Sequence, residues 1–115
     1  MQHRSTSYNR SRAIVFFTFL FIAVQLKAQQ PYIPFQHYSS VDGLSQNQVS
    51  SILQDQQGFM WFGTLEGLNR FDGYEFTVYR HSDKDSTSLS NDFAGSVIED
   101  HEGTIWVGTG RGLNR

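Results

Sequence analysis

The chain of 115 residues contains no cysteine, 15% aromatic residues, 17% charged residues and a formal net charge of −2. The lack of cysteine excludes disulfides and thiolate metal sites. The aromatic content favours a β protein over a charged helical or a disordered one, and the charge excludes the basic surface of a nucleic-acid-binding protein.

The first 28 residues have the pattern of a secretory signal peptide. Arg4, Arg10 and Arg12 precede an apolar run over residues 13–24, and the small residue Ala28 follows it. The run is shorter than the roughly twenty residues that span a bilayer. We therefore predict a signal peptide over residues 1–28, cleaved after Ala28, with an uncleaved N-terminal anchor as the alternative. Cleavage removes four of the nine basic residues and leaves an acidic exported chain.

Residues 29–43 form a predicted lead-in that contains one isolated outer strand. Residues 35–38 repeat the F-x-x-Y pattern of residues 76–79, but no other strand pattern precedes them. A closed ring of sheets can use such a strand to complete its last blade, which removes two free sheet edges at once. We therefore predict that residues 35–38 pair with the final blade of a propeller.

Two copies of one sequence unit follow the lead-in, 45 positions apart and without a gap. Residues 44–70 and 89–115 are identical at 12 of 27 positions. A repeat of about 40 to 50 residues with glycine and tryptophan at fixed offsets is typical of a β-propeller blade. We predict an all-β fold, a β-propeller fragment of about two four-stranded blades, with repeat 1 over residues 44–88 and an incomplete repeat 2 over residues 89–115.

The number of repeats also carries an expectation about the whole protein. A propeller closes with roughly four to eight blades, so the chain is expected to be the opening piece of a longer protein. Its predicted partners are the remaining blades of that parent chain.

Each repeat divides into strands and turns. Apolar and β-branched runs predict inner strands, Asp-x-x-Gly predicts the hairpin after them, and alternating residues predict the second and fourth strands. Asp72-Gly73 is a hairpin signal between the third and fourth strands. The predicted strands are residues 49–54, 59–64, 68–71 and 74–79 in the first repeat, and 94–99 and 104–109 in the second.

The residues common to both repeats are candidates for structural roles. Trp61 and Trp106 are expected to pack between adjacent sheets, with stacking on a sugar as the alternative. Asp55 and Asp100 recur at turns, whereas catalytic carboxylates seldom recur in every unit of an array. The predicted structural motif consists of Asp55, Gly58, Trp61, Gly63, Thr64, Gly67, Leu68, Asn69 and Arg70, and of Asp100, Gly103, Trp106, Gly108, Thr109, Gly112, Leu113, Asn114 and Arg115.

Three patterns that suggest chemistry fail on inspection. Residues 108–112 are glycine-rich, but Leu113 occupies the third glycine position of a phosphate loop. A calcium-binding hand that starts at Asp83 needs glycine at its sixth position and glutamate at its twelfth, where this chain has Ser88 and Ala94. No H-E-x-x-H pair is present. We therefore predict no catalytic residue, no cofactor and no metal site in this chain, and we do not expect it to be an enzyme.

The motif D-x-x-G-x-x-W-x-G-T-x-x-G-L-N-R-F-D-G, residues 55–73 and again 100–115, resembles the two-component regulator propeller repeat. The resemblance covers residues 35–115. It implies an exported N-terminal piece of a periplasmic sensor region, in a hybrid sensor histidine kinase of the Bacteroidetes type that is anchored in the inner membrane. Many members of this family sense oligosaccharides released from glycans, so an oligosaccharide is the implied ligand of the full-length protein.

Two other functions remain open at this point. The chain could belong to a secreted propeller enzyme that acts on polysaccharide, or to a propeller interaction scaffold without enzymatic activity. In each case no nucleic acid is expected to bind this segment. Contact with a membrane is expected only through the parent chain or an uncleaved signal segment.

Overall fold

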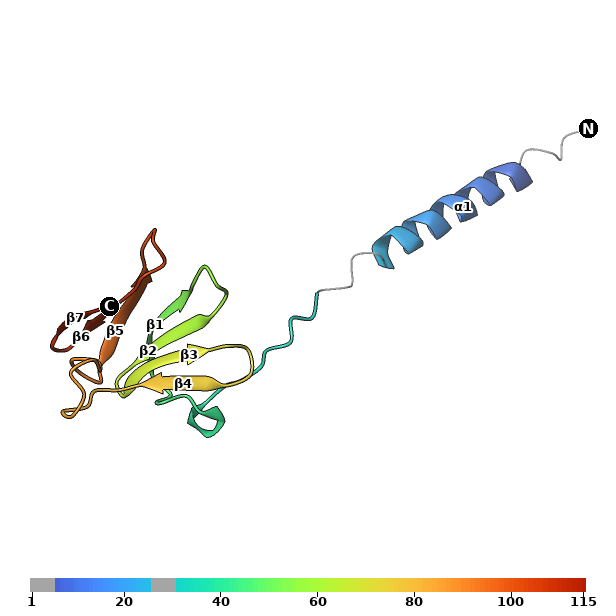
Figure 1. Ribbon diagram of the computed structural model, residues 1–115. Helices are drawn as coiled ribbons and strands as arrows, with labels where there is room; N and C mark the ends of the chain where they lie inside the picture. The colour runs from blue at the N-terminus through green and yellow to red at the C-terminus, as the bar shows by residue number, and fades with distance from the viewer. Residues whose placement is uncertain (1–5, 26–30) are drawn as a thin grey trace, which may run out of the picture. The chain divides into compact units, whose positions relative to one another are not determined.

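The computed structural model describes residues 6–25 and 31–115, which divide into two units, up to Phe35 and from Gln36 onward (Figure 1). The first unit contains one α-helix, α1 (Thr6–Gln25), which includes the apolar run of the predicted signal peptide. Among the described residues, no helix combines the length and apolar character that crossing a bilayer needs. The predicted cleavage point after Ala28 lies outside the described residues.

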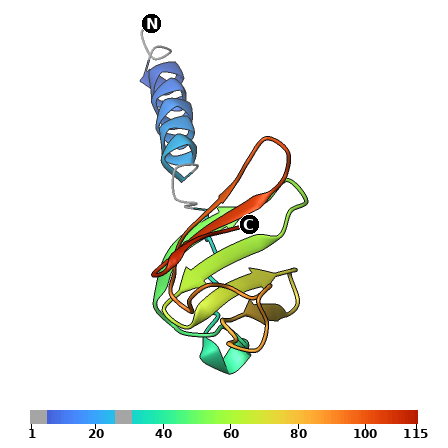
Figure 2. The same ribbon diagram turned by 60° about the vertical axis from the view of Figure 1, so that its left-hand side comes forward.

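The second unit consists of two antiparallel sheets, and the predicted all-β propeller fragment is confirmed. The first sheet has four strands in the order β1-β2-β3-β4, and the second has three in the order β5-β6-β7. Both hairpin turns, after β1 and after β5, extend at the same end of the unit (Figure 2). The strands are β1 (Val49–Gln54), β2 (Met60–Thr64), β3 (Gly67–Phe71), β4 (Phe76–Tyr79), β5 (Ala94–Glu99), β6 (Ile105–Thr109) and β7 (Gly112–Asn114).

The two sheets repeat each other in register as well as in sequence. Val49 lies opposite Thr64 in the first sheet, and Ala94 lies opposite Thr109 in the second. A β-bulge follows both Val49 and Ala94, so the inner strand shifts its alternation at the same point in each sheet. Each four-stranded or three-stranded sheet is therefore one blade, called blade 1 and blade 2 below.

The core lies between the blades, where β5 packs against β1 and β2. Its buried members are Leu68 from blade 1 and Ala94, Val97 and Val107 from blade 2. Gly63 lets the backbones approach closely, because a Cβ atom at this position would collide with the carbonyl oxygen of Ala94. A blade buries one sheet face only when a neighbouring blade lies against it, as repeat architectures require.

The lead-in differs from its predicted form. Residues 35–38 form no strand in the described part of the chain, so their pairing with another blade stays a prediction. Tyr38 packs against blade 1, with its ring centroid 5.0 Å from that of Phe71 and 6.0 Å from that of Phe76. A short 3₁₀-helix that the sequence pattern did not predict, η1 (Ser40–Asp42), follows with Ser39 as its N-cap.

Candidate functional site

Asp55 and Trp61 form one hydrogen-bonded unit at the turn of blade 1. One carboxylate oxygen of Asp55 accepts from the backbone N–H groups of Gln57 (3.0 Å) and Phe59 (2.9 Å), and the other accepts from the indole Nε1–H of Trp61 at 2.8 Å. Gly58 completes the turn with a φ of 92°, a left-handed conformation that favours glycine. We call this arrangement the turn network.

Blade 2 has the same turn network. Asp100 accepts from the backbone N–H groups of Glu102 and Thr104, both at 2.9 Å, and from Nε1–H of Trp106 at 2.8 Å. Gly103 has a φ of 83°. The D-x-x-G-x-x-W spacing therefore places one carboxylate between a tight turn and the following strand.

The turn network lowers the pKa of both carboxyl groups. Partial burial acts to raise the pKa of Asp55, but the hydrogen bonds from Trp61 and the backbone outweigh it and leave that pKa below its ordinary value. The bond from Trp106, followed by that from Thr104, lowers the pKa of Asp100. Both carboxyl groups are therefore ionised at neutral pH, as hydrogen-bond acceptors from a turn should be.

A second hydrogen-bond network in blade 1 joins Ser45, which precedes β1, to Thr64 in β2 and Asn69 in β3. Asn69 accepts from the backbone N–H of Ser45 through Oδ1 and donates to the Ser45 hydroxyl through Nδ2, both at 2.8 Å. The Thr64 hydroxyl donates to the carbonyl of Gly67 at 2.9 Å, so the Ser45 hydroxyl is the donor in its 2.8 Å bond with Thr64. Thr64 and Asn69 are fully buried, and this buried network satisfies both hydroxyl groups.

Blade 2 repeats the buried network with matching partners. Asn114 bonds the backbone N–H and the hydroxyl of Ser90, at 3.0 and 2.9 Å, and Thr109 bonds the Ser90 hydroxyl and the Gly112 carbonyl, at 2.8 and 2.9 Å. Sequence reasoning included the threonine and the asparagine in the motif but omitted Ser45 and Ser90. Their identity in both repeats was the available signal.

The remaining motif residues contribute to packing. Leu68 is buried between the blades, and the guanidinium carbon of Arg70 lies 4.8 Å from the centroid of the Phe59 ring. Trp61 packs against the buried cluster, and its ring stacks on that of Tyr79 with centroids 5.9 Å apart. The structure thus divides the motif into the turn network, the buried network and a set of contacts between blades.

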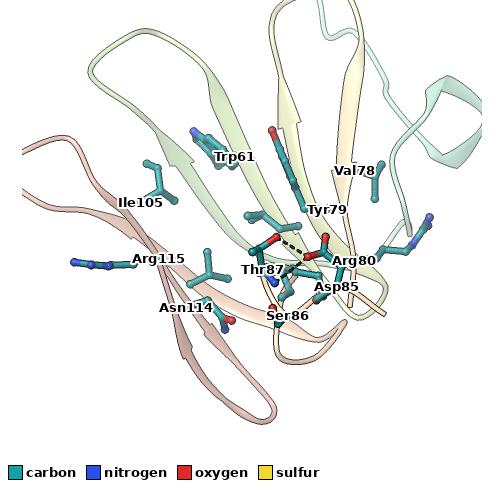
Figure 3. A pocket seen from close by; sticks show the side chains of 14 residues that line it. Trp61, Val78, Tyr79, Arg80, Asp85, Ser86, Thr87, Ile105, Asn114 and Arg115 are labelled. Carbon is teal, nitrogen blue, oxygen red and sulfur yellow. Dashed lines mark hydrogen bonds between the residues drawn. The ribbon is translucent and has the colours of Figure 1, made fainter. Parts of the chain in front are cut away.

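A cleft of about 820 Å³ opens between the blades and is the candidate ligand site (Figure 3). Trp61 and Tyr79 line it from blade 1, and Ile105 and Asn114 line it from blade 2, while the loop after β4 contributes residues 85–88. β7 lies at the edge of its sheet here, in the position that β4 covers in blade 1.

The polar groups of the cleft come from arginines and the loop. Arg80 and Arg115 both line it, and Arg80 donates through Nε to the carbonyl of Glu66 at 2.9 Å. Asp85 accepts from the hydroxyl (2.6 Å) and the backbone N–H (2.9 Å) of Thr87, and these bonds, the hydroxyl first, lower the pKa of its carboxyl group. Asp85 and the hydroxyl groups of the loop thus lie beside an aromatic wall, while the guanidinium groups of both arginines point away from it (Figure 3).

His81 anchors the loop that joins the blades. Its Nδ1 lies 2.7 Å from the carbonyl oxygen of Leu89, and its Nε2 lies 2.9 Å from a carboxylate oxygen of Asp83. Because the first partner is a carbonyl and the second a carboxylate, both favour the protonated ring, and the pKa of His81 is raised.

The cleft has binding groups but no assembled metal site. Within residues 6–25 and 31–115, no three histidine, aspartate or glutamate side chains gather where they could hold a metal ion. An aromatic wall with nearby hydroxyl groups can bind a ligand that has an apolar ring face and polar substituents.

Comparison with known proteins identifies both repeats. A family model described as "Two component regulator propeller" matches residues 43–66 and 88–111. Histidine kinase P4 of Formosa agariphila is 49% identical to the chain over 72 residues, which are 63% of this chain and 5% of that protein.

Solved structures of two extracellular domains are also similar to this chain. The extracellular domain of a hybrid two component system from B. thetaiotaomicron, BT3049, matches with a TM-score of 0.62 and 43% identity over 68% of this chain and 11% of that chain. The extracellular domain of BT4673 from the same organism matches with a TM-score of 0.55 and 28% identity, over 59% and 10% of the two chains. The chain thus spans about a tenth or less of the length of each of these relatives.

Proposed function

Because this chain belongs to the two component regulator propeller family, we propose that it is the exported N-terminal part of the sensor region of a hybrid histidine kinase. The main support for this proposal is that two successive blades share one motif and one set of hydrogen bonds and resemble extracellular domains of two-component systems. The proposed parts are a signal peptide (1–28), a lead-in (29–43), a first propeller repeat (44–88) and a second (89–115).

The proposal separates sensing from catalysis. The chain lies in the periplasm as part of a parent protein anchored in the inner membrane, and the kinase activity belongs to other parts of that parent. Sequencing the gene beyond the codon for Arg115 tests this arrangement. We expect further repeats, an apolar span of about twenty residues and then a histidine kinase region. A secreted enzyme or a scaffold would lack the span and the kinase.

The ligand that we propose is a glycan-derived oligosaccharide. Support comes from the cleft, where Tyr79 presents a partly exposed ring beside the hydroxyl groups of Thr87 and Ser88. A sugar ring has an apolar face for such a ring and hydroxyl groups for such partners.

Calorimetry with the full chain tests the ligand class. Neutral oligosaccharides and oligosaccharides of equal length that contain uronic acids are titrated separately, and at least one of the two classes is expected to bind. Tyr79→Ala should abolish the binding, whereas Tyr74→Ala, at an exposed hairpin outside the cleft, should preserve it. Equal loss in both variants, or binding of neither sugar class, contradicts the proposed ligand site but leaves the family assignment intact.

A further inference from the structure

The connection from blade 1 to blade 2 is longer than the segment that leads into blade 1. Leu89 follows Tyr79 of the F-x-x-Y pattern by ten residues, whereas Leu44 follows Tyr38 of the same pattern by six. We call residues 80–93, between the end of β4 and the start of β5 (Figure 1), the inter-blade loop.

Part of the inter-blade loop closes on itself between Ser82 and Ser88. The backbone N–H of Ser82 donates to the Ser88 hydroxyl oxygen at 2.9 Å, and that hydroxyl donates to the carbonyl of Asp85 at 2.7 Å. The backbone N–H groups of Asp85 and Ser88 donate to the carbonyls of Ser82 and Asp85, both at 3.1 Å. These bonds all lie within residues 82–88, so they do not attach this part of the loop to either blade.

His81 attaches the loop to the start of the second repeat. Its backbone N–H donates to the Asp92 carboxylate at 2.7 Å. Its ring lies between the carbonyl oxygen of Leu89, 2.7 Å from Nδ1, and the carboxylate of Asp83, 2.9 Å from Nε2. Leu89 packs against the buried cluster and precedes Ser90 of the buried network. We call the side chains of His81 and Asp83, together with the carbonyl of Leu89, the histidine clasp.

Both ring nitrogens of the histidine clasp face a hydrogen-bond acceptor. A carbonyl oxygen and a carboxylate oxygen can only accept, so each needs an N–H from the ring. A neutral imidazole has one N–H and therefore leaves a lone pair against its second partner. The protonated ring donates to Leu89 and to Asp83 at the same time. Both distances therefore fit the protonated ring.

The lead-in makes the same backbone contact without ionisable side chains. The backbone N–H of Ser40 donates to the side-chain oxygen of Asn47 at 2.8 Å. Asn47 and Asp92 are 45 positions apart and occupy the same position of the repeat. The backbone contact is thus common to both connections, while the histidine and its two neighbouring carboxylates are added in the inter-blade loop.

We propose that the histidine clasp is a proton-operated device that fixes the inter-blade loop. With the proton bound, the ring of His81 joins Asp83 to Leu89. When the proton is lost, the ring keeps its bond to Leu89 and releases Asp83, whose side chain is 97% exposed and moves into water. Residues 82–88 then lose this tie to blade 2 and become more mobile.

The charged groups near the ring come from two segments. Asp83 belongs to the closed part of the loop, and Asp92 belongs to the segment before β5; both attract the protonated ring. The cations that flank His81 in the sequence are Arg80 and Lys84. Arg80 directs its Nε to the carbonyl of Glu66 at 2.9 Å.

The direction of the pH dependence follows from these contacts. The hydrogen bond to the Leu89 carbonyl, followed by that to Asp83, raises the pKa of His81 above its ordinary value of 6.5. The clasp is therefore fully closed below pH 6.5 and opens as the pH rises through the raised pKa. Residues 85–88 also line the cleft, so the same proton affects the order of that wall.

Nuclear magnetic resonance of the imidazole nitrogens in the full 115-residue chain tests the first step. The His81 signals are assigned by their absence in His81→Gln. We expect them to titrate with a midpoint above 6.5 and to show N–H on both nitrogens below that midpoint. In Asp83→Asn the midpoint should move towards 6.5, because the carboxylate is gone.

Hydrogen exchange tests the effect on the loop. The protection factor, which compares each amide with the same amide in an unstructured peptide at the same pH, is measured for Asp85 and Ser88. We expect it to fall by about two- to fivefold from mildly acidic to mildly alkaline pH, an effect of the size of an exposed ion pair. The amides of Asp100 and Gly103, bonded within the hairpin turn of blade 2, should keep their protection and show that the fold is intact.

Three variants separate the clasp from other effects of pH. His81→Gln should remove the pH dependence of loop protection. Asp83→Asn should also remove it, because an amide can donate to the unprotonated Nε2 and accept from the protonated one. The matched control is His101→Gln, at a ring that is 91% exposed in the hairpin turn, and it should leave the pH dependence of the loop unchanged.

Three results would overturn the proposal. The first is a His81 midpoint at or below 6.5. The second is loop protection that stays constant while His81 titrates, which would show that the ring does not hold the loop. The third is a pH dependence of loop protection that persists in His81→Gln or in Asp83→Asn, which would assign it to other groups.

Discussion

Blades 1 and 2 contain the same residues in two different environments. Leu68 is 4% exposed because blade 2 covers it, whereas its counterpart Leu113 is largely exposed. Yet the turn network and the buried network have nearly the same bond lengths in both blades. The hydrogen bonds of the motif therefore belong to a single blade, while its apolar residues gain their burial only from a neighbour.

The largest expected difference between the blades is in the free energy of unfolding after each of two equivalent leucines, Leu68 and Leu113, is shortened to alanine. Leu68→Ala removes a side chain from the closed contact and should lower the free energy of unfolding by about 2 to 5 kcal/mol. Leu113→Ala removes an exposed side chain and should change it by less than about 0.5 kcal/mol. Urea unfolding followed by tryptophan fluorescence measures both values. Equal losses would show that Leu113 is covered in solution.

The next largest difference in stability is expected when each of two equivalent glycines, Gly63 and Gly108, is replaced by alanine. In Gly63→Ala the new Cβ collides with the backbone of Ala94 and with the Ser51 hydroxyl, and overpacking of this kind costs about 1 to 3 kcal/mol. In Gly108→Ala the only close atom is the Ser96 hydroxyl oxygen, at 2.5 Å, which a side-chain rotation can move. We expect Gly108→Ala to be nearly neutral in the same unfolding experiment. A large loss in Gly108→Ala would mean that the serine, and not the neighbouring backbone, sets the requirement for glycine.

Losing a hydrogen bond of the buried network should cost more stability in blade 1 than in blade 2, because Thr64 is buried and Thr109 is only half-buried. Thr64→Val leaves the Ser45 hydroxyl without its acceptor and the Gly67 carbonyl without its donor, at a cost of about 1 to 3 kcal/mol because these groups are out of water. Thr109 makes the same bonds but is only half-buried. Water can replace the lost bonds there, so Thr109→Val should cost less. Equal costs would contradict the role of burial.

The sequence predicted the elements of this fold well because each of them is encoded locally. The apolar and β-branched runs of residues 49–54 and 94–99 coincide with β1 and β5, and the Asp-x-x-Gly pattern coincides with both hairpin turns. The lead-in was less predictable. Its F-x-x-Y pattern describes a strand, but a strand also needs a paired edge, and residues 35–38 have none within the described chain.

The buried network shows what local patterns miss. Ser45 lies 24 positions before Asn69, and their contact depends on how the segment before β1 passes over the sheet. Neither composition nor alternation encodes that path. The repeat itself was the only sequence evidence, because a serine that recurs with its threonine and asparagine partners is constrained by the same contact in each blade.

The smallest expected effect is one that the two blades share. The pKa values of Asp55 and Asp100 lie below the ordinary value of 3.8, so both carboxylates stabilise the fold above that pH. As the pH falls below 3.8 and through their lowered values, protonation weakens the acceptor and this stability is lost. Replacing either residue by asparagine removes the charged acceptor of the indole bond.

We therefore expect Asp55→Asn and Asp100→Asn to lower stability at neutral pH and to flatten its decline in acid, by similar amounts in the two variants. Urea unfolding at several pH values between neutrality and the acid range measures this decline. Asp72 and Asp85 also have lowered pKa values, so part of the acid dependence should persist in each variant. If Asp100→Asn left the acid decline unchanged while Asp55→Asn flattened it, the turn network would depend on the neighbouring blade after all, and the assignment of these hydrogen bonds to a single blade would be wrong.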